Sequence, residues 1–179
     1  MSRIGKQPIA IPKEVKITIE PGLIVCVGKK GMLRLEIPKG ISVKLEENVL
    51  SVSRDDDTKQ FRSLHGTIRV LISNMIDGVT DGFKKELELI GVGYKAQLKG
   101  KDLVLNIGFS HPVEMHIPES LKVTVPSPTR IVVEGINKQE VGEFAAKVRR
   151  NYPPEPYKGK GIRYLGEEVR RKLGKALAK

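Results

Sequence analysis

The sequence predicts an α+β protein of two similar small domains, each an antiparallel or mixed sheet packed on one face by a helix. Three observations support this fold class. Residue types recur along the 179-residue chain at an offset of about 80 positions, as in internally duplicated proteins. Each copy begins with alternating or apolar runs interrupted by glycine and ends with apolar residues at helical spacing. Strands followed by a single helix, twice over, are typical of α+β domains.

The repeat is clearest where a proline follows an isoleucine at the start of a strand-like run. Another strand-like pair follows in each copy, at residues 50–52 and 131–133. The matching residues are Ile37, Pro38, Ile41, Val43 and Leu45 in the first copy and Ile117, Pro118, Leu121, Val123 and Val125 in the second. An agreement of this length predicts two structural copies and not a chance likeness.

The opening runs of each copy predict strands that hairpin turns connect. The expected strands cover residues 17–20, 23–27 and 32–37 in the first copy and 87–90, 94–98 and 103–107 in the second. Glycine and lysine at 28–31 and 100–101 are typical of hairpin turns. We place the domain boundary after the first helix, which gives domains of residues 1–81 and 82–179.

A helix closes each copy in this prediction. Apolar residues recur at helical spacing over 61–76 and again over 141–148. Gly78 is placed to end the first helix. Asn137 is a good N-cap for the second, and Glu140, three positions on, can complete a capping box.

The positive charge is concentrated in the C-terminal tail. The chain has 32 Lys and Arg against 21 Asp and Glu, a net charge of +11. From Lys147 onward 11 basic and 3 acidic residues give +8, which leaves +3 for the rest. Such a balance suits polyanions, either a nucleic acid or an acidic membrane surface.

Residues 152–164 combine three of the four tyrosines with three prolines and the bases Lys158, Lys160 and Arg163. Proline extends the backbone, and glycine at 159 and 161 permits close approach to a phosphate. Such a strip can follow RNA, with tyrosines stacking on unpaired bases. A solvated, flexible basic loop explains the composition equally well.

A short amphipathic helix is expected after this strip. Val169, Leu173 and Leu177 form a narrow apolar stripe that could dock on the second sheet, leaving the basic face free for phosphate. A membrane-surface helix ranks below RNA binding because the stripe is short and lacks Trp and Phe. The basic residues of the other faces are Arg170, Arg171, Lys172 and Lys175.

The remaining composition predicts a cytoplasmic protein. A single cysteine, Cys26, excludes an internal disulfide framework. The N-terminus has no apolar core of a secretory signal, and no apolar run is long enough to span a bilayer.

No motif predicts a catalytic site, a metal or a cofactor. Asp55, Asp56 and Asp57 suit a solvated turn that supplies an N-cap better than a metal site. The glycine-rich stretches at 91–93 and 158–161 lack the spacing of nucleotide-binding loops. The three histidines have no ligand partners at zinc spacing; they are His65, His111 and His116. Proton transfer by one of these histidines would be the basis of a competing hypothesis, an enzyme acting on RNA.

At residues 154–162 the sequence is PEPYKGKGI, which closely resembles the signature of the bacterial large-subunit ribosomal protein six family. The opening MSRIGKQPIAIP and residues 88–113 also resemble this family, so the likeness spans essentially the whole chain. The resemblance implies two domains from a duplication and a monomer bound to 23S ribosomal RNA near the base of the factor-binding stalk. Neighbouring stalk-base proteins would be direct partners, and translation factors indirect ones. Tyr152 departs from the family pattern, which is often basic there, so we assign it no phosphate contact.

Together, the charge pattern and the resemblance predict an RNA-binding surface in the second domain. Lys and Arg would position the protein on phosphates, and tyrosines and glycines would fit one RNA shape. An extraribosomal regulator that binds DNA or messenger RNA is the alternative. The expected RNA-binding residues are Arg149, Arg150, Tyr157, Lys158, Gly159, Lys160, Gly161, Arg163, Tyr164, Arg170, Arg171, Lys172 and Lys175.

Overall fold

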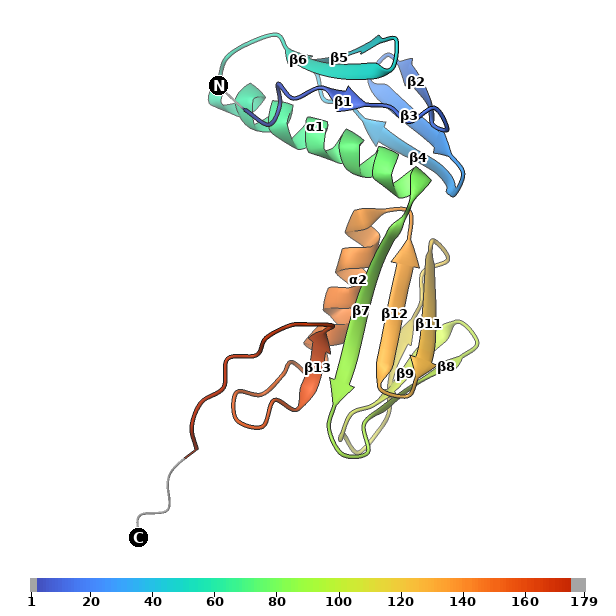
Figure 1. Ribbon diagram of the computed structural model, residues 1–179, viewed down its shortest axis with the longest axis vertical. Coiled ribbons are helices and arrows are strands. Elements are labelled where there is room, and N and C mark those ends of the chain that lie inside the picture. The colour runs from blue at the N-terminus through green and yellow to red at the C-terminus, as the bar shows by residue number, and fades with distance from the viewer. Residues whose placement is uncertain (1–2, 175–179) are drawn as a thin grey trace. The chain divides into compact units, whose positions relative to one another are not determined.

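A computed structural model describes residues 3–174 of the chain (Figure 1). The chain divides into two compact units. The N-terminal unit runs to Phe83 and includes residues 136–138, and the C-terminal unit holds residues 84–135 and the chain from Gln139 onward. Each unit is described by itself.

Two three-stranded antiparallel sheets form the N-terminal unit. One has the order β2-β3-β4, with β2 at Lys16–Glu20, β3 at Leu23–Gly28 and β4 at Gly31–Glu36. The other has the order β1-β6-β5, with β1 at Ile9–Ala10, β5 at Ile41–Glu46 and β6 at Val49–Arg54. The sequence predicted one sheet here. The chain divides into two sheets at residues 37–40, where Pro38 and the left-handed Gly40, with φ of 84°, interrupt the ladder.

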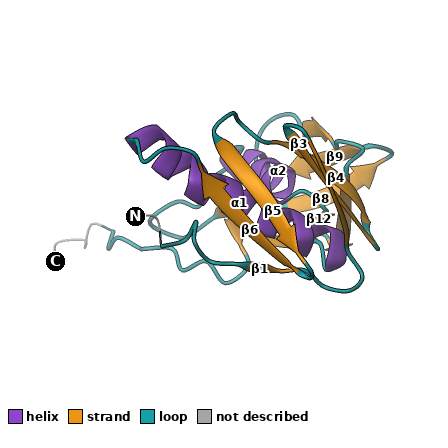
Figure 2. Cartoon of the chain, turned by 90° about the horizontal axis from the view of Figure 1, so that it is seen from above, coloured by secondary structure: helices purple, strands orange, loops and turns teal. Residues whose placement is uncertain are grey.

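Helix α1, Lys59–Thr80, packs against both of these sheets (Figures 1 and 2). It contacts β3 and β4 of one sheet and β5 and β6 of the other. Its buried stripe at helical spacing is the one that the sequence predicted. The core residues with the least exposure are Ile24, Cys26, Leu50, Ile72, Ile76 and Val79.

Both ends of α1 differ from the prediction. Thr58, and not one of the aspartates, is the N-cap, and its hydroxyl accepts a hydrogen bond from the Phe61 N–H at 3.4 Å. Gly78 lies inside the helix, where a Cβ would collide with the Ile136 carbonyl oxygen. The helix ends at Thr80 with Asp81 as its C-cap, and the following Gly82, with φ of 71°, donates a hydrogen bond to the Asp77 carbonyl at 3.0 Å that closes the last turn.

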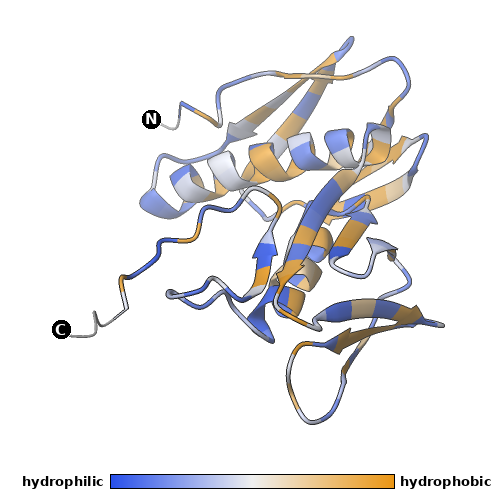
Figure 3. Ribbon diagram, turned by 60° about the horizontal axis from the view of Figure 1, so that its bottom comes forward, coloured by the Kyte–Doolittle hydropathy of each residue, from blue (hydrophilic) through white to orange (hydrophobic). Residues whose placement is uncertain are grey.

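The C-terminal unit contains a four-stranded and a three-stranded sheet. The first has the order β11-β12-β7-β13, with β7 at Phe83–Ile90, β11 at Leu121–Ser127, β12 at Arg130–Gly135 and β13 at Gly161–Tyr164. The second has the order β10-β9-β8, with β8 at Lys95–Lys99, β9 at Asp102–Asn106 and β10 at Val113–His116. Hydrophobic and hydrophilic residues alternate along these strands in Figure 3, as expected for strands with one face in the core.

Helix α2, Lys138–Arg150, lies along the four-stranded sheet (Figure 1). It begins directly after Asn137, the predicted N-cap position. Its buried residues are Val141, Phe144, Ala145 and Val148. The α+β class and the two predicted hairpins, at 28–31 and 99–102, are confirmed.

The predicted C-terminal helix is wrong over its described part. Residues 167–174 adopt no helix, and the Leu173 side chain is 99% exposed. A helix this short is marginal unless its apolar face is packed, and Leu173 has no such packing. Leu177 and Lys175 lie outside the described residues.

Candidate nucleic-acid interface

The basic strip at residues 152–160 is a loop held at both ends by backbone hydrogen bonds. The Glu155 N–H donates to the Lys160 carbonyl at 2.9 Å, and the Ile162 N–H donates to the Tyr152 carbonyl at 2.8 Å. Strand β13 then pairs antiparallel with β7, from Gly161 opposite Ile90 to Tyr164 opposite Leu87. We call residues 152–160 the basic loop. Its position is therefore fixed by the sheet, and it is not the free loop that composition alone allowed.

Gly161 is required by packing within the loop itself. Its φ is 141°, and a Cβ there would lie 2.7 Å from the Pro153 carbonyl oxygen and 2.7 Å from the Pro154 Cα. These are backbone atoms that cannot rotate away. The sequence interpretation, in which this glycine leaves room for a phosphate, is wrong at Gly161, because the chain itself fills the space. Gly159 is also buried and has a φ of 73°.

The chain after β13 folds back onto the basic loop. The Lys172 N–H donates to the Pro156 carbonyl at 2.7 Å, and the Leu165 N–H donates to the Glu86 carbonyl at 2.9 Å. We call residues 167–174 the C-terminal segment. With β13 it forms a pocket lined by Arg163, Glu168, Val169, Arg170 and Arg171. A basic pocket thus forms here without the predicted helix.

Two of the predicted RNA-binding arginines form ion pairs within the unit. Arg149 donates to both carboxylate oxygens of Glu167, at 2.5 and 3.1 Å. Arg163 donates twice to one oxygen of Glu88, at 3.1 and 3.2 Å. The Arg149 guanidinium lowers the pKa of the Glu167 carboxyl, and the same pairing raises the pKa of Arg149. These two arginines therefore fasten the C-terminal segment and β13 in place.

The other described members of the predicted set are more accessible. Lys160 and Tyr164 are half-buried. Two cations lie over the Tyr164 ring, with Lys85 Nζ at 5.7 Å and the Arg149 guanidinium at 5.8 Å from its centroid. Lys175 lies outside the described residues. The exposed members are Arg150, Tyr157, Lys158, Arg170, Arg171 and Lys172.

Comparison with known proteins agrees with this division into two units. The profile of the family described as Ribosomal protein L6 matches residues 11–82 and 90–165. The chain belongs to the ribosomal protein L6 family. It is 54% identical to the large ribosomal subunit protein uL6 of Alkaliphilus metalliredigens, over 98% of each chain. The corresponding identities are 55% for Bacillus cereus, over 98% of each chain, and 52% for Moorella thermoacetica, over 100% of this chain and 98% of the relative.

Membership of the L6 family confirms the resemblance that the signature carried, and the two matched segments agree with the internal repeat. It makes the chain a structural ribosomal constituent, whose place is the large subunit of the cytoplasmic ribosome. Among residues 3–174 no helix has the length and apolar character needed to cross a bilayer.

The sequence did not predict an aromatic cluster that this L6-family chain builds beside the basic loop. The Tyr152 ring packs edge-on against Tyr94, with centroids 5.7 Å apart, and against Phe109, at 5.8 Å. Phe109 in turn stacks on His111, at 6.4 Å and 19°. These residues come from three separate loops, so no local pattern joins them. The glycines at 91 and 108, which leave room for the Tyr94 ring, were the feature of the sequence that could have indicated this cluster.

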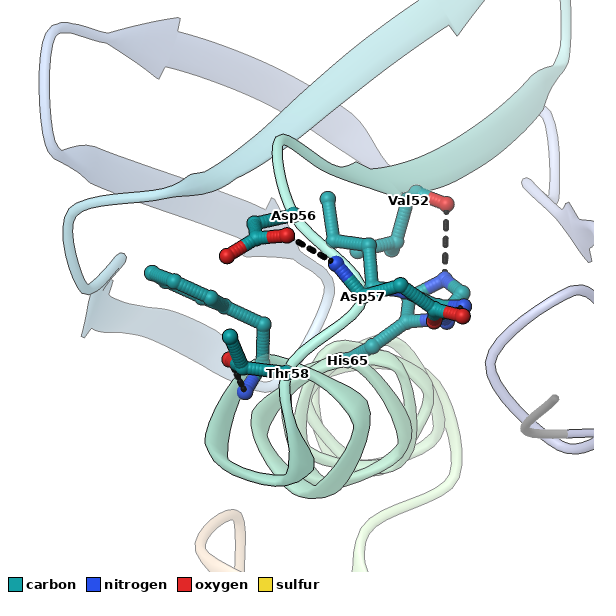
Figure 4. Close-up of polar contacts among 7 residues, drawn as sticks. Val52, Asp56, Asp57, Thr58 and His65 are labelled. Atoms are coloured by element: carbon teal, nitrogen blue, oxygen red, sulfur yellow. Dashed lines mark hydrogen bonds and ion pairs between the residues drawn. The ribbon is translucent and has the colours of Figure 1, made fainter.

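His65 and Asp57 have structural roles in the N-terminal unit of this L6-family chain (Figure 4). The His65 side chain is buried, with Nε2 2.9 Å from the Val52 carbonyl oxygen and Nδ1 3.0 Å from Arg54 Nη1. Because a guanidinium can only donate, Nδ1 accepts and Nε2 carries the proton. Arg54 also donates to Asp57. No group of three or more potential ligands that could hold a metal occurs within residues 3–174.

Proposed function

We propose that this protein binds 23S ribosomal RNA through its C-terminal unit and orders it near the base of the factor-binding stalk, in support of translation. One observation supports the proposal most strongly. Strand β13 and the C-terminal segment place Arg163, Arg170 and Arg171 around one pocket, and the Lys172 N–H ties the segment to the basic loop, which carries the exposed Lys158. Lysine and arginine on a fixed surface neutralise phosphates and release counterions, which is the main source of affinity for nucleic acid.

The proposed residues fall into two groups by role. Arg150, Lys158, Arg170, Arg171 and Lys172 are exposed and contact phosphates, while the exposed Tyr157 stacks on a base or a ribose. Lys160 and Tyr164 flank them. The second group shapes the surface from within; it consists of Arg149, Gly159, Gly161 and Arg163.

The N-terminal unit has a different task in this proposal. Residues 1–81 carry 13 basic and 10 acidic residues, so their net charge is close to neutral. Such a surface suits neighbouring stalk-base proteins better than RNA. The protein acts as a monomer within the ribosome. It affects translation factors indirectly, through the RNA that it orders. In this proposal the two functional domains are residues 1–81 and 82–179.

The test uses the full-length protein and 23S ribosomal RNA. A triple variant, Lys158→Ala with Arg170→Ala and Arg171→Ala, removes three exposed charges from the proposed surface. The matched control removes three exposed charges from the N-terminal unit, Lys13→Ala with Lys39→Ala and Lys44→Ala. Filter binding is measured at several salt concentrations for both.

For about 6 neutralised phosphates, the logarithm of affinity should fall with the logarithm of salt concentration at a slope of roughly −4 to −5. The site variant should bind more weakly, with a slope smaller by about 2 to 3, because each lost contact removes about 0.7 to 0.9. The control should keep the original slope. Equal losses in both variants would contradict the assignment. Protein found mostly free of large subunits in cell fractions would favour the extraribosomal regulator instead.

A further inference from the structure

Two loops of the C-terminal unit expose large apolar side chains. Val92, between β7 and β8, is 94% exposed, and Phe109, between β9 and β10, is 47% exposed. Val92 lies between Gly91 and Gly93, and Phe109 follows Gly108. Large exposed apolar side chains can mark a binding surface.

Packing holds these loops rigidly against the basic loop. The Tyr94 ring fills the space beside Gly91 and Gly108, where a Cβ would lie 2.5 and 3.2 Å from ring atoms. A hydrogen bond between the hydroxyls of Tyr94 and Tyr152, together with desolvation, raises the pKa of Tyr94 to about 12. Tyr152 is also the first residue of the basic loop. Its ring therefore joins the two loops to the loop that carries the proposed phosphate contacts.

The chemistry of the surface suits a nucleic acid base. Phe109 and His111 present nearly parallel rings, and both are exposed. Residues 91–94 and 107–113 contain no Asp or Glu, so nothing in these loops repels a phosphate backbone. Glycines at 93 and 108 have φ of 77° and 90°, and nothing lies within 4 Å of a Cβ at 93, which leaves room for a sugar. Every base offers a flat face to an aromatic ring.

We propose that Phe109 and His111 form a second RNA-contact surface on which an unpaired base stacks, with the exposed Val92 on the other loop that packs against Tyr94. This inference rests on the proposed function, because it assigns a further contact to the same RNA. It separates two kinds of interaction in the C-terminal unit. The basic loop and C-terminal segment bind phosphates, whereas this surface, which we call the aromatic platform, selects a folded RNA that displays a free base at the right place.

The test measures binding of full-length variants to 23S ribosomal RNA at several salt concentrations. Phe109→Ala should weaken binding roughly 5- to 150-fold, the range expected when one stacked base is lost. Its salt slope should stay unchanged, because no phosphate contact is removed. Phe109→Trp should restore binding, and Phe109→Leu should not, since leucine is apolar but has no π face. Chemical probing should show one unpaired nucleotide that the wild type protects and Phe109→Ala does not.

Other results would overturn the inference in distinguishable ways. Unchanged affinity of Phe109→Ala, together with a loss in the Lys158, Arg170 and Arg171 variant, would reject the platform and leave the proposed function standing. No loss in either variant would reject both. Full binding by Phe109→Leu, or normal RNA binding with failure to enter large subunits, would indicate an apolar contact with a protein. If Phe109→Ala fails to fold, His111→Ala, which removes the other exposed ring, provides the same comparison.

Discussion

Replacing Gly161 by alanine tests whether the basic loop depends on close backbone packing. Gly161 and Gly166 both have positive φ, 141° and 76°. An L-residue in such a conformation costs about 1–2 kcal/mol. They differ in their surroundings, since nothing lies within 4 Å of a Cβ at 166, whereas a Cβ at 161 meets Pro153 and Pro154 backbone atoms at 2.7 Å. Gly166→Ala is therefore a matched control.

The collision adds a second cost at position 161. The backbone of residues 153–154 must move away, which disrupts the hydrogen bonds from the Ile162 N–H to Tyr152 and from the Glu155 N–H to Lys160. Each contributes about 1 kcal/mol. The total for Gly161→Ala is about 3–4 kcal/mol, against about 1–2 kcal/mol for Gly166→Ala.

Urea unfolding of both variants measures these free energies, and hydrogen exchange of the Ile162 amide reports whether the loop opens alone. Gly161→Ala should also lose affinity for 23S ribosomal RNA, because Lys158 would no longer be held in place. Equal destabilisation by the two substitutions would refute the argument, since it would show that φ alone matters. A strong loss of stability with full RNA affinity would refute the link between loop shape and binding.

Three further predictions concern the stability and chemistry of the protein. His65→Leu should lower the free energy of unfolding by about 2–3 kcal/mol, because it leaves the buried Val52 carbonyl without a donor; thermal and urea unfolding measure this. Arg149 lowers the pKa of Glu167 in the folded state. This pair therefore stabilises the fold at pH values above 4.5, the ordinary pKa of the carboxyl, and the stabilisation is lost as pH falls through the lower pKa of the folded state. The advantage of wild type over Glu167→Gln, about 1 kcal/mol at pH 7, should therefore shrink in unfolding experiments below pH 4.5. Burial raises the pKa of the Cys26 thiol to about 11, so a thiol reagent at pH 7 should label it only in denaturant; labelling of the native protein at the rate of a free thiol would contradict this.

The sequence predicted most elements whose partners are near in the chain; β10, which pairs with the adjacent β9, is an exception. Hairpins such as β3–β4 and β8–β9 depend on turns of two residues, and α1 depends on its own apolar stripe, so local patterns suffice. Strands β1 and β13 pair with β6 and β7, which are distant in sequence. The segment that forms β13 is basic and rich in glycine, and nothing in its pattern shows which edge it completes.

The positive charge of the candidate site was predictable from the sequence, but the ion pairs and the backbone conformation of the site were not. The excess of lysine and arginine after residue 147 can be counted directly. The ion pairs of Arg149 with Glu167 and of Arg163 with Glu88 depend on tertiary folding, so the sequence did not show them. The helix predicted around Val169 failed because periodicity describes a face without showing whether anything covers it.

The place of β13 in the four-stranded sheet affects how the protein can be made. Strand β7 is synthesised early in the C-terminal unit, yet one of its edges stays open until β13 has followed it along almost the whole remaining chain. An open edge invites pairing with other chains. A truncated product would therefore lack a shaped basic loop and carry a strand prone to aggregation, and it would not present the proposed RNA-binding surface.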